Sequence, residues 1–254
     1  MYLVINNNQT QRAIYLNSLS AAADALTKRV DNITQFINLS SVADSLAKKN
    51  AELLAEAENA KFIKTVLRDT FRSAETEQLF TFIESKVINN SINKNNNSLS
   101  INRGSEHGIV PGMGVIGANQ SGVVGIVKST SKYYSRVMSI LHRQSFISAS
   151  IKRNGHFGSI VWKDNDPRAV NMVDVPKHAS IVKGDSIQTS GYSTIFPEGI
   201  FIGLVDTFWI PSGSNFFEIK VTLVNDLNKT KYVYVVNNLM KEDLEKIKEE
   251  GINE

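Results

Sequence analysis

Residues 176–205 read PKHASIVKGDSIQTSGYSTIFPEGIFIGLV, and this stretch decides the fold class. It contains two short β-patterns, Asp185–Thr189 and Ile200–Val205. The turn signal Lys183-Gly184-Asp185 begins the first, and Phe196-Pro197-Glu198-Gly199 precedes the second. Glycine supplies positive φ without a steric penalty, proline fixes φ at a turn value, and a glycine inside a strand, such as Gly203, marks a bulge or close backbone approach. The stretch therefore predicts a small, sharply bent β-barrel without a nucleophile motif, metal cage or phosphate loop.

Short β-patterns of the same kind recur after Arg72, where the apolar period changes from that of a helix to that of strands. They are about 10–15 residues apart with no helical pattern between them, which is typical of antiparallel barrels or sandwiches. The Asn-rich segment Asn89–Asn97 predicts a hairpin loop, because Asn tolerates left-handed φ. The expected strands are Phe80–Ile88, Leu99–Asn102, Gly114–Gly117, Val123–Lys128, Arg136–Leu141, Phe146–Ile151, Gly158–Trp162, Val170–Val175, Asp185–Thr189, Ile200–Thr207, Phe216–Leu223 and Lys231–Val236.

An internal echo indicates that the β region contains two related units. Val110-Pro111-Gly112-Met113 is followed by Gly122…Gly125-Ile126-Val127. Val182-Lys183-Gly184-Asp185 is followed in the same way by Gly199…Gly203-Leu204-Val205. The two copies are degenerate, so the echo suggests a repeat of one supersecondary unit without fixing its limits.

The N-terminal part carries a heptad period, with a shift of phase near Asn38–Ser41. One helix with a stutter and two helices with a kink are both consistent with this shift. A narrow apolar stripe buries little without a partner, so we expect a parallel homodimer in which Asn50 sets the register; the alternative is a helix folded back on its own barrel. The expected dimerisation seam is Leu16, Leu19, Ala23, Leu26, Val30, Ile33, Ile37, Leu46 and Leu53.

Composition describes a globular chain without a nucleic-acid footprint. The 254 residues include 28 Lys and Arg against 25 Asp and Glu, and they include no cysteine. Because the charges nearly balance and no long basic run occurs, nucleic acid is not expected as a partner. The lack of cysteine excludes disulfides and thiolate sites, and no apolar run reaches the ~18 residues of a membrane helix.

Residues 176–205 resemble the bacterial cell-shape-determining MreC family. A second resembling stretch, INRGSEHGIVPGMGV, occupies residues 101–115. Three further segments follow in the order of the family: Gly122–Val127, Ser135–Val137 and Asn154–Val161. The resemblance covers residues 99–236. The family pattern falls on Pro176, Ala179, Ile181, Gly184, Asp185, Ile187, Thr189, Ser190, Gly191, Phe196, Pro197, Gly199, Ile200, Ile202, Gly203 and Val205.

The resemblance implies a mainly β fold with a long N-terminal α-helix, a coiled coil followed by two six-stranded antiparallel β-barrels that are chymotrypsin-like. The expected domains are a coiled-coil helix at residues 1–75, a first barrel at 76–153, a second barrel at 154–237 and a short charged helix or tail at 238–254. The family also carries a membrane helix, of which Met1–Ile5 would be the last turn. On composition alone this segment is equally a short strand or a frayed end.

Glycine and proline positions of the matched stretches are expected to form structural turns. No Gly-Lys-Ser/Thr follows the first glycine cluster, so a phosphate loop is not expected there. The expected turn residues are Gly104, Gly108, Gly112, Gly184, Gly191, Pro197, Gly199 and Gly203.

No catalytic residue, cofactor or metal site is predicted. A serine nucleophile needs a base within hydrogen-bond reach and an oxyanion loop. The best local candidates, Ser190 and Ser193, lie in no known nucleophile motif. His142 and His156 are expected at strand or turn ends, and the four histidines of the chain lack the spacing of metal ligands.

Four aromatic residues in the distal β region form the candidate partner surface: Phe208, Trp209, Phe216 and Phe217. Neighbouring side chains in a strand point to opposite faces, so one member of each adjacent pair cannot enter the same core as the other. Packing between the barrels and an exposed apolar binding surface are the two interpretations of these rings.

The resemblance implies a non-catalytic periplasmic scaffold of the rod-shape cell-wall elongation machinery, located at the inner membrane. The implied partners are a penicillin-binding transpeptidase, the membrane protein MreD and, indirectly, the MreB cytoskeleton, together with a second copy of the chain. The alternatives are a divergent serine hydrolase on protease-like barrels and a periplasmic adaptor of an efflux or secretion system. Adaptors usually place a helical hairpin between barrel halves, whereas the helical period comes first here.

Overall fold

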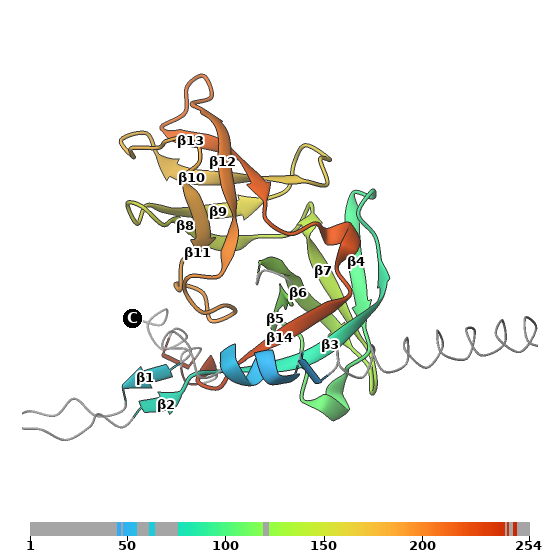
Figure 1. Cartoon of the computed structure of the whole chain (residues 1–254). Helices are drawn as coiled ribbons and strands as arrows, with labels where there is room; N and C mark the ends of the chain where they lie inside the picture. Colours follow the sequence, from blue (N-terminus) through green and yellow to red (C-terminus); the bar gives the residue numbers. More distant parts are fainter. Residues whose placement is uncertain are drawn as a thin grey trace, which may run out of the picture. The chain divides into compact units, whose positions relative to one another are not determined.

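The structure is a computed structural model that describes residues 45–46, 48–54, 61–63, 76–118, 122–241, 243 and 246–247. Two closed six-stranded antiparallel barrels make up most of this part of the chain (Figure 1). Both barrels belong to one compact unit that begins at Lys49. All twelve strands expected from the sequence are present, and two of them, Gly114–Gly117 and Phe216–Leu223, have the expected bounds.

The first barrel closes with a strand from the far end of the chain. Its strands are β3 (Phe80–Asn90), β4 (Asn96–Ile101), β5 (Gly114–Gly117), β6 (Val123–Thr130), β7 (Ser135–His142) and β14 (Tyr232–Asn238). Around the barrel they run β14-β3-β4-β7-β6-β5, so β14 lies between β3 and β5 (Figure 1). A short 3-10 helix, η2 (Ser105–His107), interrupts the connection from β4 to β5.

The second barrel is inserted between β7 and β14 of the first. Its strands are β8 (Ile147–Ile151), β9 (Phe157–Val161), β10 (Ala169–Pro176), β11 (Ser186–Thr189), β12 (Phe201–Trp209) and β13 (Phe216–Leu223). Their order around the barrel is β10-β13-β12-β11-β8-β9. This arrangement differs from the expected division at residues 153 and 154, because β8 belongs to the second barrel and β14 to the first. A β-pattern in the sequence does not say which earlier strand will pair with it.

Alternating strand residues fill the two interiors. Ile101, Val115 and Ile140 are fully buried in the first barrel, and Ile187 and Ile219 are fully buried in the second. A period of two places one face of each strand inside, and this face is rich in the β-branched residues that fit a pleated surface.

The two halves of the sequence echo form the same local structure. In the first barrel, Gly112 N–H donates to Val127 O at 2.8 Å and Val127 N–H donates to Met113 O at 2.8 Å. In the second, Gly184 N–H donates to Val205 O at 2.8 Å and Val205 N–H donates to Asp185 O at 2.9 Å. Both glycines have a φ of +88°, which a side chain would strain.

The strand orders show that the repeat extends to the whole barrel. Strands β5, β6 and β7 form a meander in which β7 returns to pair with β4, and β11, β12 and β13 form the same meander with β13 on β10. In the first barrel β14 pairs with both β3 and β5. In the second barrel its counterpart β8 pairs with both β9 and β11. The barrels therefore share one cyclic topology, with the equivalent strand last in one barrel and first in the other.

The Asn-rich segment forms the hairpin tip expected from the sequence, although the strands reach further into it. β3 continues to Asn90 and β4 begins at Asn96, so the tip spans residues 91–95. The buried Asn97 side chain accepts a hydrogen bond from Lys94 N–H at 2.8 Å and donates to Leu141 O at 2.8 Å. Asn97 therefore joins the tip to β7.

The N-terminal region differs from the long helix expected over residues 1–75. Residues 45–46 and 48–54 are helical, but β1 (Lys61–Ile63) pairs with β2 (Thr76–Gln78) in an antiparallel ladder. The pairing overrides the continued heptad, since Phe62 and Ile63 belong to residue types that favour strands. No helix within the described residues is long and apolar enough to cross a membrane.

Most of the expected dimerisation seam, from Leu16 to Ile37, lies outside the described residues. Leu46 and Leu53 are described, and both are exposed. The side chain of Asn50, for which a register-setting role is expected, hydrogen-bonds to the phenol of Tyr234 on β14. Burial raises the pKa of Tyr234 above its ordinary value, and this hydrogen bond opposes the rise.

Candidate partner-binding surface

Exposed aromatic residues gather at the free end of the β12–β13 hairpin. Phe208 is 39% exposed, Trp209 43%, Ile210 44% and Phe216 48%. We call these four residues the hairpin surface. Large apolar side chains exposed together are typical of contact sites, whereas single exposed ones are common on any protein.

Strand register explains which way the rings point. Phe208 lies opposite the buried Ile219 on β13, and Trp209 lies opposite Glu218. Directly opposed residues share a face, so Phe208 and Phe217 lie on the inner face while Trp209 and Phe216 lie on the outer one.

The inner-face rings lie at the rim of the barrel and are not fully enclosed. Phe208 and Phe217 meet edge to face with ring centroids 5.8 Å apart and an interplanar angle of 81°. Phe217 is half-buried opposite Val175 of β10, and Phe208 is exposed. The two rings of each adjacent pair therefore lie on opposite faces, and the inner-face rings are only partly covered because the hairpin projects past the core residues.

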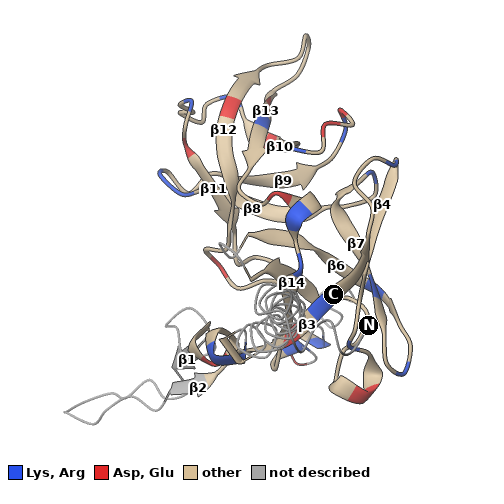
Figure 2. Ribbon diagram, turned by 45° about the vertical axis from the view of Figure 1, so that its right-hand side comes forward, with Lys and Arg blue, Asp and Glu red and all other residues tan. Residues whose placement is uncertain are grey.

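Charged residues flank the outer face of the hairpin. Lys163 Nζ lies 3.0 Å from Glu218 Oε1, and Lys220 Nζ lies 3.4 Å from Asp166 Oδ2. An apolar centre with paired charges around it is the usual composition of a protein–protein contact. Figure 2 shows that basic and acidic residues are interspersed over both barrels.

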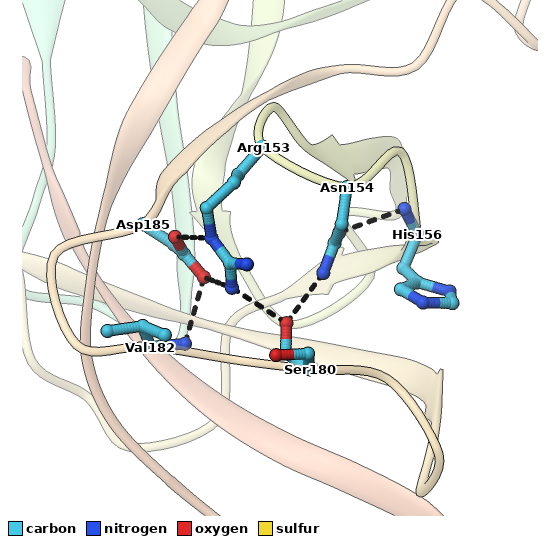
Figure 3. Close-up of polar contacts among 6 residues, drawn as sticks. All are labelled: Arg153, Asn154, His156, Ser180, Val182 and Asp185. Atoms are coloured by element: carbon cyan, nitrogen blue, oxygen red, sulfur yellow. Dashed lines mark hydrogen bonds and ion pairs between the residues drawn. The ribbon is translucent and has the colours of Figure 1, made fainter.

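A buried carboxylate holds together two turns of the second barrel (Figure 3). Asp185 accepts hydrogen bonds from Arg153 Nε at 2.7 Å and Nη2 at 2.9 Å, and from Val182 N–H at 2.9 Å. Arg153 Nη2 and Asn154 Nδ2 both donate to Ser180 O, at 2.8 Å and 2.6 Å. These contacts join the β8–β9 turn to the loop between β10 and β11.

The Arg153 guanidinium holds the pKa of the Asp185 carboxyl below its ordinary value, against the opposing effect of burial. The same hydrogen bond raises the pKa of Arg153. Sequence reasoning found the Gly184-Asp185 turn but missed Arg153, since no local pattern says which distant cation will reach a buried carboxylate.

The serines and histidines considered for a catalytic triad lie in separate local turns. Ser190 Oγ lies 2.7 Å from Ser148 Oγ, and Ser193 Oγ accepts a hydrogen bond from Ile195 N–H at 3.1 Å. His142 Nδ1 accepts a hydrogen bond from Gln144 N–H at 3.0 Å.

The His156 ring stacks edge to face on His178, with centroids 5.7 Å apart. Within the described ranges, no hydrogen bond joins a serine side chain to a histidine, which a triad requires. In the same part of the chain, no group of three or more potential ligands could hold a metal ion.

The expected turn residues differ in the positions that they occupy. Five have positive φ, which favours glycine: Gly108, Gly112, Gly184, Gly191 and Gly199. Gly104 instead lies against the β6–β7 turn, where a Cβ would be 2.2 Å from Ser131 O. Gly203 lies inside β12. Pro197 lies between β11 and β12, and its carbonyl oxygen accepts a hydrogen bond from Thr189 Oγ1 at 2.6 Å.

Two nested six-stranded barrels with an exposed aromatic hairpin define the class of this part of the chain as a double β-barrel protein. The family model "Rod shape-determining protein MreC, barrel core" matches residues 87–237. The chain belongs to this family.

Relatives and solved structures agree with the family model. The chain is 26% identical over 191 residues to a cell shape-determining protein MreC from Listeria monocytogenes, covering 74% of this chain and 63% of that protein. A crystal structure of MreC from Pseudomonas aeruginosa is 25% identical with a TM-score of 0.56, covering 61% of this chain and 98% of that one. The chain spans between 51% and 65% of the length of the curated relatives it matches.

One structural neighbour contains a partner. It is a complex between a penicillin-binding protein, PBP2, and MreC from Helicobacter pylori, with 18% identity and a TM-score of 0.51, covering 63% of this chain and 99% of that one. At this identity the neighbour supports the fold of the barrels.

Proposed function

We propose that this protein is a non-catalytic scaffold that organises peptidoglycan synthesis enzymes in the rod-shape elongation machinery. The barrels would lie in the periplasm at the inner membrane and control cell shape by holding their partners in place. The proposal rests on membership of the MreC family. It also rests on the exposed hairpin surface, since the described residues present this surface and assemble no catalytic group.

The observation that carries the proposal is the hairpin surface. Trp209 and Phe216 point away from the barrel on adjacent strands, where a partner can cover them. Buried aromatic anchors contribute a large share of the free energy of binding at protein–protein contacts. We assign this surface to a penicillin-binding transpeptidase, because the Helicobacter pylori complex pairs MreC with a penicillin-binding protein.

The remaining partners follow from the family and from the N-terminal period. We propose contacts with the membrane protein MreD, an indirect link to the MreB cytoskeleton, and a homodimer formed through the helical seam. Exposure of Leu46 and Leu53 supports the homodimer, since leucines on a helix are usually covered.

A matched pair of variants tests the transpeptidase assignment. Trp209→Ser with Phe216→Ser should weaken capture of the transpeptidase by at least about tenfold, because truncated anchors typically cost 2 kcal/mol or more. Tyr133→Ser with Tyr134→Ser is the control, since both tyrosines are also exposed but lie on the first barrel. Affinity is measured by biolayer interferometry and cell shape by microscopy of complemented cells. Equal affinity for the two double variants would contradict the assignment.

A second set separates a scaffold from a hydrolase. Replacing Ser190, Ser193 and His156 with Ala should leave both capture and rod shape unchanged. Loss of rod shape with capture intact would instead favour catalysis, since no scaffold contact would have been removed.

A further inference from the structure

The first barrel carries a groove on its outer surface that is separate from the hairpin surface. The groove encloses about 310 Å³ and is lined by residues of β4, β6 and β7 and by the turn after β7. Its polar lining includes Ser98, Lys128, Ser129, Arg136, His142 and Gln144.

Strand pairing brings these side chains together. Arg136 of β7 lies opposite Ser129 of β6, and His142 lies opposite Asn96 of β4. The β6–β7 register shifts between Val127 and Ser129, so Lys128 occupies an irregular position. A bulge re-aims side chains and is common beside binding sites.

The groove is basic and has no acidic residue in its lining. Lys128, Arg136 and His142 come from two adjacent strands. Arg136 donates from Nε and Nη2 to Ser98 Oγ, at 3.3 Å each. Among the residues that the structure describes, no carboxylate forms an ion pair with Lys128 or Arg136.

The electrostatics of His142 show that both cations act on this ring. Burial lowers the pKa of His142 below its ordinary value, and the positive charges of Lys128 and Arg136 lower it further. The residues facing it from β4, Asn96 and Ser98, are uncharged. Like charges held close together without a counterion destabilise one another, and a bound anion would relieve this repulsion.

The hydrogen bond at His142 leaves a donor available to a ligand. Nδ1 accepts from Gln144 N–H at 3.0 Å, so the neutral ring carries its proton on Nε2. Protonation of Nδ1 would break the bond to Gln144. The neutral ring can therefore serve as a hydrogen-bond donor beside the two permanent cations.

We propose that this groove binds a phosphate group. A phosphate monoester carries a charge of about −1.5 to −2 at neutral pH and three strong acceptor oxygens, which match two permanent cations with histidine and serine donors. A single carboxylate would leave one of the cations uncompensated. The volume exceeds that of phosphate itself, so there is room for the group esterified to it.

The test measures phosphate binding to the full chain at constant ionic strength. Inorganic phosphate is titrated while the His142 imidazole resonances are followed by NMR over a range of pH. Bound phosphate should raise the pKa of His142, because a negative charge favours the protonated ring. By linkage, phosphate of a given charge should bind the protonated ring more tightly than the neutral ring, by the same factor that the shift in this pKa expresses.

Charge-neutralising variants define the site. Lys128→Gln with Arg136→Gln should weaken phosphate binding by about tenfold or more, since both charge-assisted contacts are lost. Lys152→Gln, an exposed lysine on the second barrel, removes one positive charge elsewhere and should leave the affinity within about twofold. The proposal would be overturned if the His142 resonances did not shift when phosphate is added, or if Lys152→Gln weakened phosphate binding as much as the double variant.

Two further probes distinguish the source of the phosphate. Soluble glycerol 3-phosphate represents a free ester, and vesicles containing phosphatidylglycerol represent a lipid headgroup. Binding of either probe that is lost in the double variant supports the site, and the probe with the greater affinity identifies the source. Binding that the double variant retains would place the phosphate elsewhere and refute the proposal.

Discussion

Gly203 offers the sharpest test of how the second barrel is packed, because the neighbouring strand occupies the space where a side chain would begin. A Cβ added at Gly203 would lie 2.1 Å from Thr222 O and 2.9 Å from the Thr222 carbonyl carbon. Carbon–oxygen contacts between neighbouring strands are ordinarily about 3.3 Å or longer, so β12 and β13 would have to separate by about 1 Å.

The expected cost follows from that displacement. Overpacking typically costs about 1–3 kcal/mol, and each strained backbone hydrogen bond adds about 1 kcal/mol. Alanine also lowers the conformational entropy of the unfolded chain, which stabilises the folded state by about 0.4–1 kcal/mol and offsets part of this cost. Gly203→Ala should therefore destabilise the barrel by about 3 kcal/mol. Gly203→Val should cost only slightly more, because the clash is already complete at Cβ.

Urea unfolding followed by tryptophan fluorescence reports on this barrel selectively. The chain has two tryptophans. Trp162 follows β9 and Trp209 ends β12, so both belong to the second barrel. A loss of about 3 kcal/mol corresponds to a fall in Tm of about 6–12 °C if the compact unit Lys49–Glu254, which contains both barrels, unfolds as one.

Gly155→Ala is the matched control. Gly155 has a φ of +72° but nothing within 4 Å of its Cβ position, so its cost should be only the backbone strain of about 1 kcal/mol. If Gly203→Ala unfolded within about 0.5 kcal/mol of wild type, the close approach of β13 would not be the reason for glycine at this position.

Three further predictions concern other parts of the chain. Asp185→Asn should cost about 2 kcal/mol at neutral pH, because a buried acceptor of charge-assisted hydrogen bonds is lost. Since the folded-state pKa of Asp185 is depressed below 3.8, its contribution is complete above that pH and is lost in more acid solution, where urea unfolding of wild type and variant should converge. Leu26→Asp with Val30→Asp should make a dimeric chain monomeric in sedimentation equilibrium, and a wild type that is already monomeric would contradict the seam. Ser190 should not react with a fluorophosphonate probe, since labelling requires an activated hydroxyl.

Local chemistry explains why so much of the barrel architecture could be predicted. Gly112 and Gly184 punctuate turns that need positive φ, and this need is visible in the sequence because only glycine meets it without strain. The strands between such turns follow from alternation, which is a property of each segment alone. The echo between the two units predicted a repeat, and matching hydrogen bonds at Val127 and Val205 confirm it.

Features that depend on distant partners could not be predicted in the same way. The pairing of β14 with β3 and β5 joins residues far apart in sequence, and no strand pattern specifies its neighbours. Arg153 and Asp185 form an ion pair across two turns that carry no shared motif. The hydrogen bond between Asn50 and Tyr234 likewise joins residues far apart in sequence.

The insertion of one barrel into the other has a consequence for display of the hairpin surface. A second barrel that followed the first in sequence would be joined to it by a single connection and could rotate about that connection. Here the chain enters after β7 and returns to β14, so residues 143–146 and 224–231 both join the barrels. Two connections restrict rotation more than one, because rotation about either connection displaces the other. The return of β14 also means that the first barrel closes only after the whole second barrel has been synthesised, so the scaffold cannot complete its first barrel without the barrel that carries the hairpin surface.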